Sequence, residues 1–449
     1  PRFGPMSVTT KRFLLVLLHV ILALGMRRFE LLSTAHALMV FVLGFYTALT
    51  AKDLKKVIPY VAYIAGAEVL WRMTDAGVFW EFGKYATIAI LGIALLRTAK
   101  IKKAGLPIIF FLVLIPSVLL TVDFFGITER ARELISFNLS GPLAVSLCLL
   151  YFSQIKMNLD EIKNWVWPTV YPILGILTLA VYSTFTATEI YFGSESLFIT
   201  SGGYGPNQVS AALSLGALLL MMLVISVSDK KGRIWTLALA IALVIQSFLT
   251  FSRGGIYNFG VALAAFVLHL LAKPEKFSRT MIILVLVGGI LVGFFFPQLE
   301  EFTGGMFSQR FLDTDLASRG ELMQADLQLF LDNPIFGVGP GIAYYIRPGL
   351  RSLAAHTEYT RLLAEHGAGG AIALLILIFV LVRAYFKAPD AVTRAWVVGL
   401  AAWPMVEMSH AAMRIVSIAF MLGIATVSWQ EDQLVEPEKV SANRYVNRR

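Results

Sequence analysis

Long apolar stretches follow one another along almost the whole chain, and short polar segments separate them. A helix needs about 20 apolar residues to cross the bilayer core. The runs do not alternate polar and apolar residues, as the strands of a membrane β-barrel do. We therefore predict an all-α polytopic integral membrane protein with spans at 13–26, 30–50, 57–71, 80–96, 105–122, 134–153, 165–187, 207–227, 234–251, 255–271, 280–297 and 366–386.

The last apolar region, 395–428, holds either one long helix or two short ones. It is interrupted by polar residues and a proline: Pro404, Glu407, His410 and Arg414. The total is therefore about 12 transmembrane helices, in the range 12–14. The first span, 13–26, is short, which indicates a tilted or re-entrant segment.

Composition agrees with a membrane protein. Hydrophobic residues make up 57% of the chain and charged residues only 15%, against about 25% in soluble domains. The net charge of +9 is interpreted as a topology signal, not as a nucleic-acid signal. Cys148 lies in an apolar run and, as the single cysteine, is expected to be a buried core residue. No cleavable signal peptide is expected, because "MRRFE" follows the first apolar run.

Lysine-rich loops alternate with lysine-poor ones. The lysine-rich loops are 51–56, 97–103, 156–163, 229–233, 272–279 and 383–394. Because lysine and arginine accumulate in cytoplasmic loops, all six are predicted to face the cytoplasm. The outward loops are then 123–133, 188–206, 252–255 and 298–365. We predict a single membrane domain, 1–449, in which 298–365 forms an extracytoplasmic helical subdomain, since long loops tend to carry function.

The outward segments contain almost no lysine but several arginines, whose guanidinium groups bind phosphate through paired hydrogen bonds. Surface ion pairs are the simpler interpretation for four of them, Arg130, Arg132, Arg347 and Arg351. Ser-Arg-Gly occurs twice, at 252–254 and 318–320, each time before a helical pattern. A helix start offers unpaired N–H groups to an anion. Ser252 and Ser318 are expected to cap these helices, with Arg253 and Arg319 beside them as anion contacts.

His356 opens the stretch "HTEYTRLLAEHGAGG" at the end of the long outer segment. It is predicted to project from the top of a helix at the outer membrane surface, where a histidine can act as a base near neutral pH. The alternative is a histidine that only caps or hydrogen-bonds. Gly367 and Gly370 are expected to permit close helix packing.

Other polar residues receive structural interpretations. His19, His36 and His269 lie within apolar spans and are expected to be packed or to join helices. His410, with Glu407 and Arg414, is expected to form an intramembrane charged network. No spacing of histidines and acids indicates a metal site. The sequence Asp313–Asp315 ("DTD") matches the metal-binding motif of many soluble glycosyltransferases, but outside the cell it is better interpreted as a turn.

Four segments in this order carry a family resemblance: "GPNQVSAALSL", "TFSRGGIYNFG", "ASRGELMQADLQLFLDNPIFGVGPG" and "HTEYTRLLAEHGAGG". Over about 205–375 the chain resembles the O-antigen ligase and polymerase superfamily of membrane glycosyltransferases. The ligase pattern is matched at His356, Thr357, Gly367 and Gly370, and Thr357 departs from the usual Asn, Ser or Gln.

The resemblance implies an enzyme of lipopolysaccharide biosynthesis in the inner membrane of a Gram-negative bacterium. It implies transfer of O-antigen from undecaprenyl pyrophosphate to a lipid A-core sugar at the periplasmic face, with no cofactor, no metal and no nucleic acid. It assigns His356 as the catalytic residue and Arg253 and Arg319 as pyrophosphate contacts. Arg310 is a further, weaker candidate. Attack opposite the leaving group would invert the anomeric centre.

Two alternatives remain open at this point. The polymerase of the same superfamily uses two sizeable outer loops, each with an arginine followed after ten residues by glycine. Here the loop 188–206 is short and has no arginine, and no such glycine follows Arg310, Arg319, Arg347 or Arg351, which favours a ligase. A transporter of lipid-linked or polar solutes is the other class, but neither paired halves nor a midplane site is visible.

Overall fold

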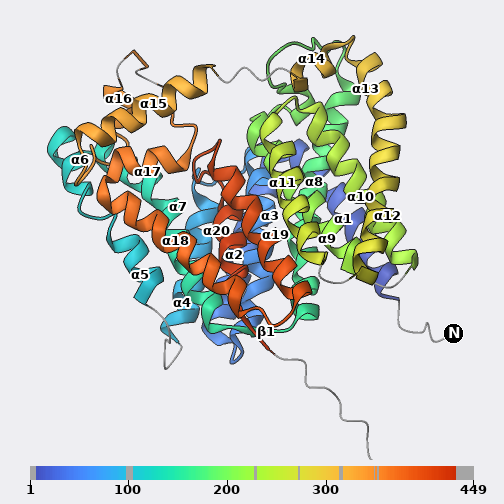
Figure 1. The fold of residues 1–449 in the computed structure, drawn as a ribbon, viewed down its shortest axis with the longest axis horizontal. Helices are drawn as coiled ribbons and strands as arrows, with labels where there is room; N and C mark the ends of the chain where they lie inside the picture. Colours follow the sequence, from blue (N-terminus) through green and yellow to red (C-terminus); the bar gives the residue numbers. More distant parts are fainter. Residues whose placement is uncertain are drawn as a thin grey trace, which may run out of the picture.

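A computed structural model shows a bundle of helices (Figure 1). It describes residues 7–97, 105–226, 230–271, 274–312, 317–347, 349–350 and 353–430. Within these ranges, nine helices are long and apolar enough to cross a membrane, and Phe82–Leu96 is a shorter apolar helix. The protein is therefore a polytopic, helical membrane protein, as predicted.

The helices begin and end close to the predicted spans. Their bounds are α1 Val8–Arg28, α2 Glu30–Thr50, η1 Leu54–Val57, α3 Ile58–Met73, α4 Phe82–Leu96, α5 Gly105–Leu112, α6 Val118–Phe125, α7 Glu129–Gln154, α8 Leu159–Thr186, η2 Ile199–Ser201, α9 Pro206–Ser226, α10 Lys230–Leu249, α11 Arg253–Leu270, α12 Pro274–Ile290, η3 Leu291–Phe295, α13 Phe296–Phe302, α14 Met306–Leu312, α15 Ala317–Asp332, α16 Ala343–Ile346, α17 Glu358–His366, α18 Ala368–Lys387, α19 Ala391–Met408 and α20 Val416–Ile424. Two short strands, β1 Lys156–Met157 and β2 Ser428–Trp429, pair in parallel.

The predicted span at 105–122 is wrong, because two short helices, α5 and α6, replace it. Apolar residues continue through the break, so hydropathy alone gives no sign of it. Pro116 cannot supply the N–H that a continuous helix requires. The chain also passes very close to α18 here: a Cβ added at Gly369 would lie 2.2 Å from the carbonyl oxygen of Val113.

The first helix and the last apolar region differ in how far they agree with the prediction. The first helix, α1, has 21 residues, so the expectation of a short first span is wrong. The last apolar region forms two helices, α19 and α20, which the non-helical residues 409–415 connect. Cys148 is a buried, free cysteine, as expected.

Two of the loops that the lysine pattern assigns to one side, 51–56 and 156–163, lie at one end of the bundle. Figure 1 shows β1 at one end and α14, α15 and α16 at the other. At the β1 end, Lys55 forms an ion pair with Glu161 at 2.5 Å, and β1 pairs with β2. These two loops therefore share one side, as the lysine pattern predicts, and the alternation of the other loops and the assignment to cytoplasm and periplasm stay predictions.

A chain of hydrogen bonds joins α1, α2 and α3 inside the bundle. Trp71 Nε1 donates to His36 Nδ1 at 3.0 Å, so neutral His36 carries its proton on Nε2 and donates it to Tyr63 Oη, also at 3.0 Å. Tyr63 then donates to His19 Nε2, and His19 Nδ1 donates to the carbonyl of Leu15. The prediction that His19 and His36 are polar helix contacts is confirmed.

Replacing Tyr63 by phenylalanine should destabilise the protein by about 1–3 kcal/mol, because it leaves a buried donor on His36 and a buried acceptor on His19 without partners. Thermal unfolding in detergent measures this loss. Tyr46→Phe is the matched control, because Tyr46 on α2 is 63% exposed on the surface of the bundle. Equal unfolding temperatures for the two variants would show that the chain of hydrogen bonds contributes nothing.

Candidate functional site

The start of α11 is fixed against the start of α9. Ser252 Oγ donates to Asn207 Oδ1 at 2.9 Å, and Ser210 Oγ donates to the carbonyl of Ser252 at 3.2 Å. Gly255 is required at this crossing, because a Cβ there would lie 2.1 Å from Ser210 Oγ. These contacts join two of the segments that carry the family resemblance. They hold Arg253, which is buried, in the first turn of α11.

The two serine caps differ from the prediction. Ser252 occupies the N-cap position of α11, but its hydroxyl makes no capping hydrogen bond and binds Asn207 instead. The second helix, α15, begins at Ala317, so Ser318 lies inside its first turn and not before it. Arg319 lies in the same turn, and its side chain is outside the described part of the structure. The segment Asp313–Asp315 is also outside the described residues.

Arg310 on α14 connects three segments of the chain. Its Nε donates to the carbonyl of Phe251 at 2.9 Å, one Nη donates to the carbonyl of Ser194, and the other lies 3.5 Å from Ser196 Oγ. Phe251 has a positive φ of 55° and directly precedes Ser252. Arg310 thus stabilises the turn from which α11 starts.

His356 lies in a bend just before α17 and is half-buried. The helix itself begins at Glu358, with Thr357 as its N-cap, whose hydroxyl accepts from the backbone N–H groups of Tyr359 and Thr360. His356 therefore lies two residues before the first residue of α17, next to the helix start at which it was expected. Because a side-chain cap fixes the first turn, the backbone beside His356 is held in place.

Glycines after α17 allow tight packing, as predicted. Gly367 ends α17 with φ +57°, a conformation that L side chains rarely adopt. A Cβ at Gly370 would lie only 1.9 Å from the carbonyl oxygen of Leu362. The two helices α17 and α18 can therefore meet at a sharp corner, at the end of α17 that lies away from His356.

The loop 409–415 between α19 and α20 contacts residues next to two of the predicted site residues, Arg253 and His356. A Cβ at Gly254 would lie 2.5 Å from His410 Cε1, so His410 sits against the first turn of α11. At the other end of the loop, Arg414 Nη2 donates to the carbonyl of Ala355 at 3.3 Å. The loop thus touches the residue after Arg253 and the residue before His356.

Charged side chains from other helices bind the backbone of the same loop. Glu358 accepts from the N–H of Met413 at 3.1 Å, and Arg72 donates to the carbonyl of Arg414 at 3.2 Å. Lys84 donates to the carbonyl of Met413 at 3.4 Å, and Glu68 accepts from the N–H of Val416 at 2.5 Å. This part of the loop is therefore held by α3, α4 and α17 together.

His410 also belongs to a polar network within the bundle. Asn258 on α11 donates to Glu407 and accepts a hydrogen bond from His410 Nε2 at 2.9 Å. His410 Nε2 lies 3.6 Å from the carboxylate of Glu407. The predicted network of Glu407 and His410 is confirmed. Arg414 does not join it, because its guanidinium is directed to the segment that contains Ala355.

A cavity of about 880 Å³ lies beside the residues that precede His356. Its walls come from the α3–α4 connection, α4, α7, residues 341–347, residues 354 and 355, α17 and the loop 409–415. Five arginines line it against three glutamates. Ala354 and Ala355, the two residues before His356, belong to the wall, whereas Arg253 and Arg310 do not.

Most arginines of this region form ion pairs. Arg130 and Arg132 make the predicted surface pairs, with Glu133 and Glu129. Arg347 was expected to do the same, but it is buried and binds Asp326 on α15 at 2.6 Å. The reason is that the outer segment folds back on α15 and α17, so that Arg347 lies inside it. Arg351 is outside the described residues.

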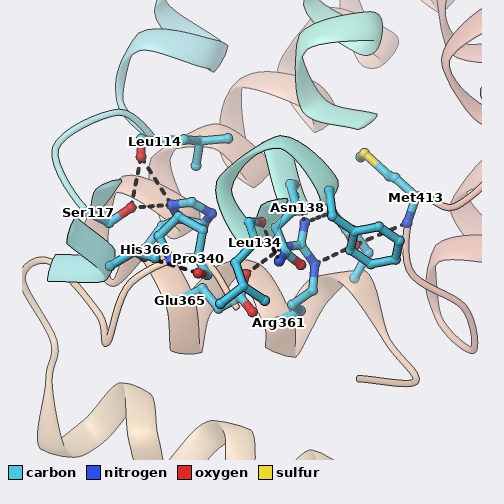
Figure 2. Close-up of polar contacts among 12 residues, drawn as sticks. Leu114, Ser117, Leu134, Asn138, Pro340, Arg361, Glu365, His366 and Met413 are labelled. Atoms are coloured by element: carbon cyan, nitrogen blue, oxygen red, sulfur yellow. Dashed lines mark hydrogen bonds and ion pairs between the residues drawn. The ribbon is translucent and has the colours of Figure 1, made fainter. Parts of the chain in front are cut away.

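Arg361 is the centre of a buried ionic cluster on α17 (Figure 2). Its Nε donates to Glu358 at 2.9 Å, and Nη1 lies 2.5 Å from Glu365 Oε2. Further hydrogen bonds reach the side chain and the carbonyl of Asn138 on α7. Burial by itself would lower the pKa of Arg361, but the two carboxylates outweigh it and raise this pKa above the ordinary arginine value. Arg361 is therefore permanently charged and ties α17 to α7.

His366, at the other end of α17, is a structural residue. It is buried, and its Nδ1 lies 2.6 Å from Ser117 Oγ and 3.1 Å from the carbonyl of Leu114 (Figure 2). Burial, with a smaller contribution from the charge of Arg361, lowers the pKa of His366 to about 3. His366 therefore stays neutral near pH 7 and joins the break between α5 and α6 to α17.

Sequence reasoning missed the place of Arg414 at the cavity. The signal was present, because an arginine within an apolar region is rare and usually functional. Its neighbour Ala355, however, lies 59 positions away in the chain, so nothing in the sequence connected the two. Among the described residues, no group of three or more His, Cys, Asp or Glu side chains could hold a metal ion.

Comparison with known proteins identifies part of the chain. Residues 237–375 match the O-antigen ligase family, and no curated protein matches the chain. The matched segment includes Arg253, Arg310, Arg319 and His356. The protein therefore carries an O-antigen ligase family domain, of a bacterial family of membrane enzymes that transfer sugars, within a multi-pass helical bundle.

Proposed function

We propose that this protein is an O-antigen ligase of the Gram-negative inner membrane. It crosses the membrane about twelve times, with residues 298–365 forming a periplasmic subdomain. It joins O-antigen carried on undecaprenyl pyrophosphate to a sugar hydroxyl of lipid A-core. The observation that carries the proposal is the position of His356: it lies in the segment matched to the ligase family and next to the wall of a cavity rich in arginine.

The reaction needs no external energy source, because pyrophosphate is already a leaving group. The acceptor hydroxyl oxygen attacks the anomeric carbon, and the bond from this carbon to the pyrophosphate oxygen breaks. His356 takes the hydroxyl proton, and the products are the glycosidic bond and free undecaprenyl pyrophosphate. Attack from the face opposite the leaving group inverts the anomeric centre. A positioned general base contributes about 10²–10⁴-fold to the rate.

Charge that grows on the departing pyrophosphate needs stabilisation. Arg253 and Arg319 take this role in the proposal, each in the first turn of a helix, where unpaired N–H groups also attract an anion. Arg310, the weaker candidate, stays a prediction. Its contacts with Phe251 and Ser194 support an indirect role, in which it positions the turn before Arg253.

The direct test uses the purified protein in liposomes with O-antigen on undecaprenyl pyrophosphate and lipid A-core. We expect glycosylated lipid A-core as the product, at the same rate with and without EDTA, because the proposed chemistry uses arginines and no metal. Complete loss of transfer in EDTA would contradict the metal-free mechanism.

The same assay separates the two activities of the superfamily. A ligase gives product only when lipid A-core is present. A polymerase would lengthen the glycan on undecaprenyl pyrophosphate in the absence of lipid A-core. Elongation without acceptor, and no transfer when acceptor is added, would replace the proposed function by that of a polymerase. Glycan that crosses the liposome membrane unchanged would indicate a transporter.

A further inference from the structure

One arginine in the 880 Å³ cavity differs from the other four. Arg130, Arg132, Arg347 and Arg361 each form an ion pair with a carboxylate. Arg414 makes no such pair with any described residue: Nη2 donates to the carbonyl of Ala355, and Nε is buried without a hydrogen-bond partner. The nearby carboxylate of Glu358 is already bound by Arg361 and by the N–H of Met413.

A buried acceptor in the same wall also lacks a partner within the described ranges. This is Oε1 of Glu81, just before α4. Buried polar atoms are almost always hydrogen-bonded, so each exception needs an explanation. Arg414 and Glu81 both line the cavity, and neither forms an ion pair with another described residue, so both side chains can bind a polar ligand there.

Aromatic side chains stand beside Glu81 in the same cavity wall. Phe79 is 57% exposed and Trp80 is 46% exposed, and both rings line the cavity. The Trp80 ring is held from one side by Arg72, whose guanidinium carbon lies 4.4 Å from the ring centre. Aromatic rings supply apolar contact area next to a few placed polar groups, a combination typical of ligand sites. The C–H face of a sugar ring fits such a surface.

We infer that this cavity is a subsite for a phosphorylated saccharide. Arg414 binds a phosphate group, Glu81 accepts a hydrogen bond from a sugar hydroxyl, and Trp80 packs against a sugar ring. This inference rests on the proposed function and adds two binding residues, Glu81 and Arg414, that lie outside the segment matched to the ligase family. Arg414 is the one arginine of the wall whose charge no described carboxylate pairs with, which favours the same negatively charged ligand.

The phosphate has two possible sources, the pyrophosphate of the donor and a phosphorylated core sugar of the acceptor. Binding to the purified, full-length protein in detergent separates them. The probes are undecaprenyl pyrophosphate, lipid A-core, and lipid A-core treated with phosphatase. Arg414→Ala should weaken binding of one phosphorylated probe by at least about tenfold, the loss expected for one charge-assisted hydrogen bond. It should leave the phosphatase-treated probe unaffected.

A selective loss for lipid A-core identifies the acceptor as the ligand, and a selective loss for undecaprenyl pyrophosphate identifies the donor. Unchanged affinity for both phosphorylated probes would overturn the inference. Arg414→Lys keeps the positive charge but loses the planar guanidinium group. Its affinity for the phosphorylated probe should therefore fall between those of the wild-type protein and Arg414→Ala. It also serves if Arg414→Ala does not fold. Arg28→Ala is the matched control, because Arg28 at the end of α1 is exposed and does not line the cavity.

The subsite and the proposed function can fail separately. If the wild-type protein transfers glycan but Arg414→Ala binds every probe normally, only the subsite is wrong. If the wild-type protein binds the probes through Arg414 but never transfers glycan, the ligase proposal is wrong and the phosphate site stands.

Discussion

Replacing His356 by alanine is expected to lower the rate of glycan transfer by about 10²–10⁴-fold, the usual contribution of a general base. The fall should appear in kcat, because His356 acts on the proton of the attacking hydroxyl and not on ground-state binding. The fold should survive, since His356 is half-buried and precedes the N-cap of α17. Transfer in liposomes, with protein amount and unfolding temperature matched to wild type, measures the effect.

His269→Ala is the matched control for this experiment. His269 lies on α11, donates from Nδ1 to the carbonyl of Ala265 and packs edge-on against Tyr385. It is one of the histidines predicted to be packed within a span, and it has no part in the proposed chemistry. We expect near-normal transfer in this variant. Full activity in His356→Ala would refute the role of His356, whatever the control shows.

Replacing Arg361 by methionine is expected to lower the free energy of unfolding by about 3–5 kcal/mol. Breaking a buried ion pair from one side leaves charges without compensation, and here two carboxylates, Glu358 and Glu365, would be left. Both are buried, as is Arg361 itself. The loss should also free Asn138 on α7, so that α7 and α17 separate more easily. Unfolding of the purified protein by denaturant in detergent measures the change.

Two comparisons make the Arg361 result specific. Arg132→Ala removes an exposed ion pair with Glu129 and should cost only about 0–1 kcal/mol. Adding Glu365→Gln to Arg361→Met should restore part of the stability, because one unpaired charge is removed. A cost below about 1 kcal/mol for Arg361→Met, or no recovery in the double variant, would show that the cluster does not stabilise the fold.

Most of the fold could be predicted because hydropathy determines where a chain enters a membrane. The long helices begin and end near the predicted spans, and the buried histidines of α1 and α2 bind other helices as expected. The break between α5 and α6 could not be predicted from hydropathy, since apolar residues continue through it. It depends on Pro116 and on the close approach of Gly369 to Val113, a contact between distant parts of the chain.

The candidate site could be predicted only in part, because it too depends on contacts between distant parts of the chain. Arg253, Arg319 and His356 carry local signals, namely a helix start or a polar residue at the end of an outer loop. Arg414 and Glu81 carry almost none, because their importance comes from which side chains do not pair with them. Arg347 shows the converse: its residue type suggested a surface pair, and its contact with the carboxylate of Asp326 makes it internal.

The unwound connection between α19 and α20 explains why so much charge lies inside an apolar bundle. Hydrocarbon offers no hydrogen bonds, so peptide groups that leave a helix at membrane depth need partners from the protein. Glu68, Arg72, Lys84 and Glu358 supply these partners to the connection. They take the place of water around this short piece of chain, so that its peptide groups stay hydrogen-bonded within the protein.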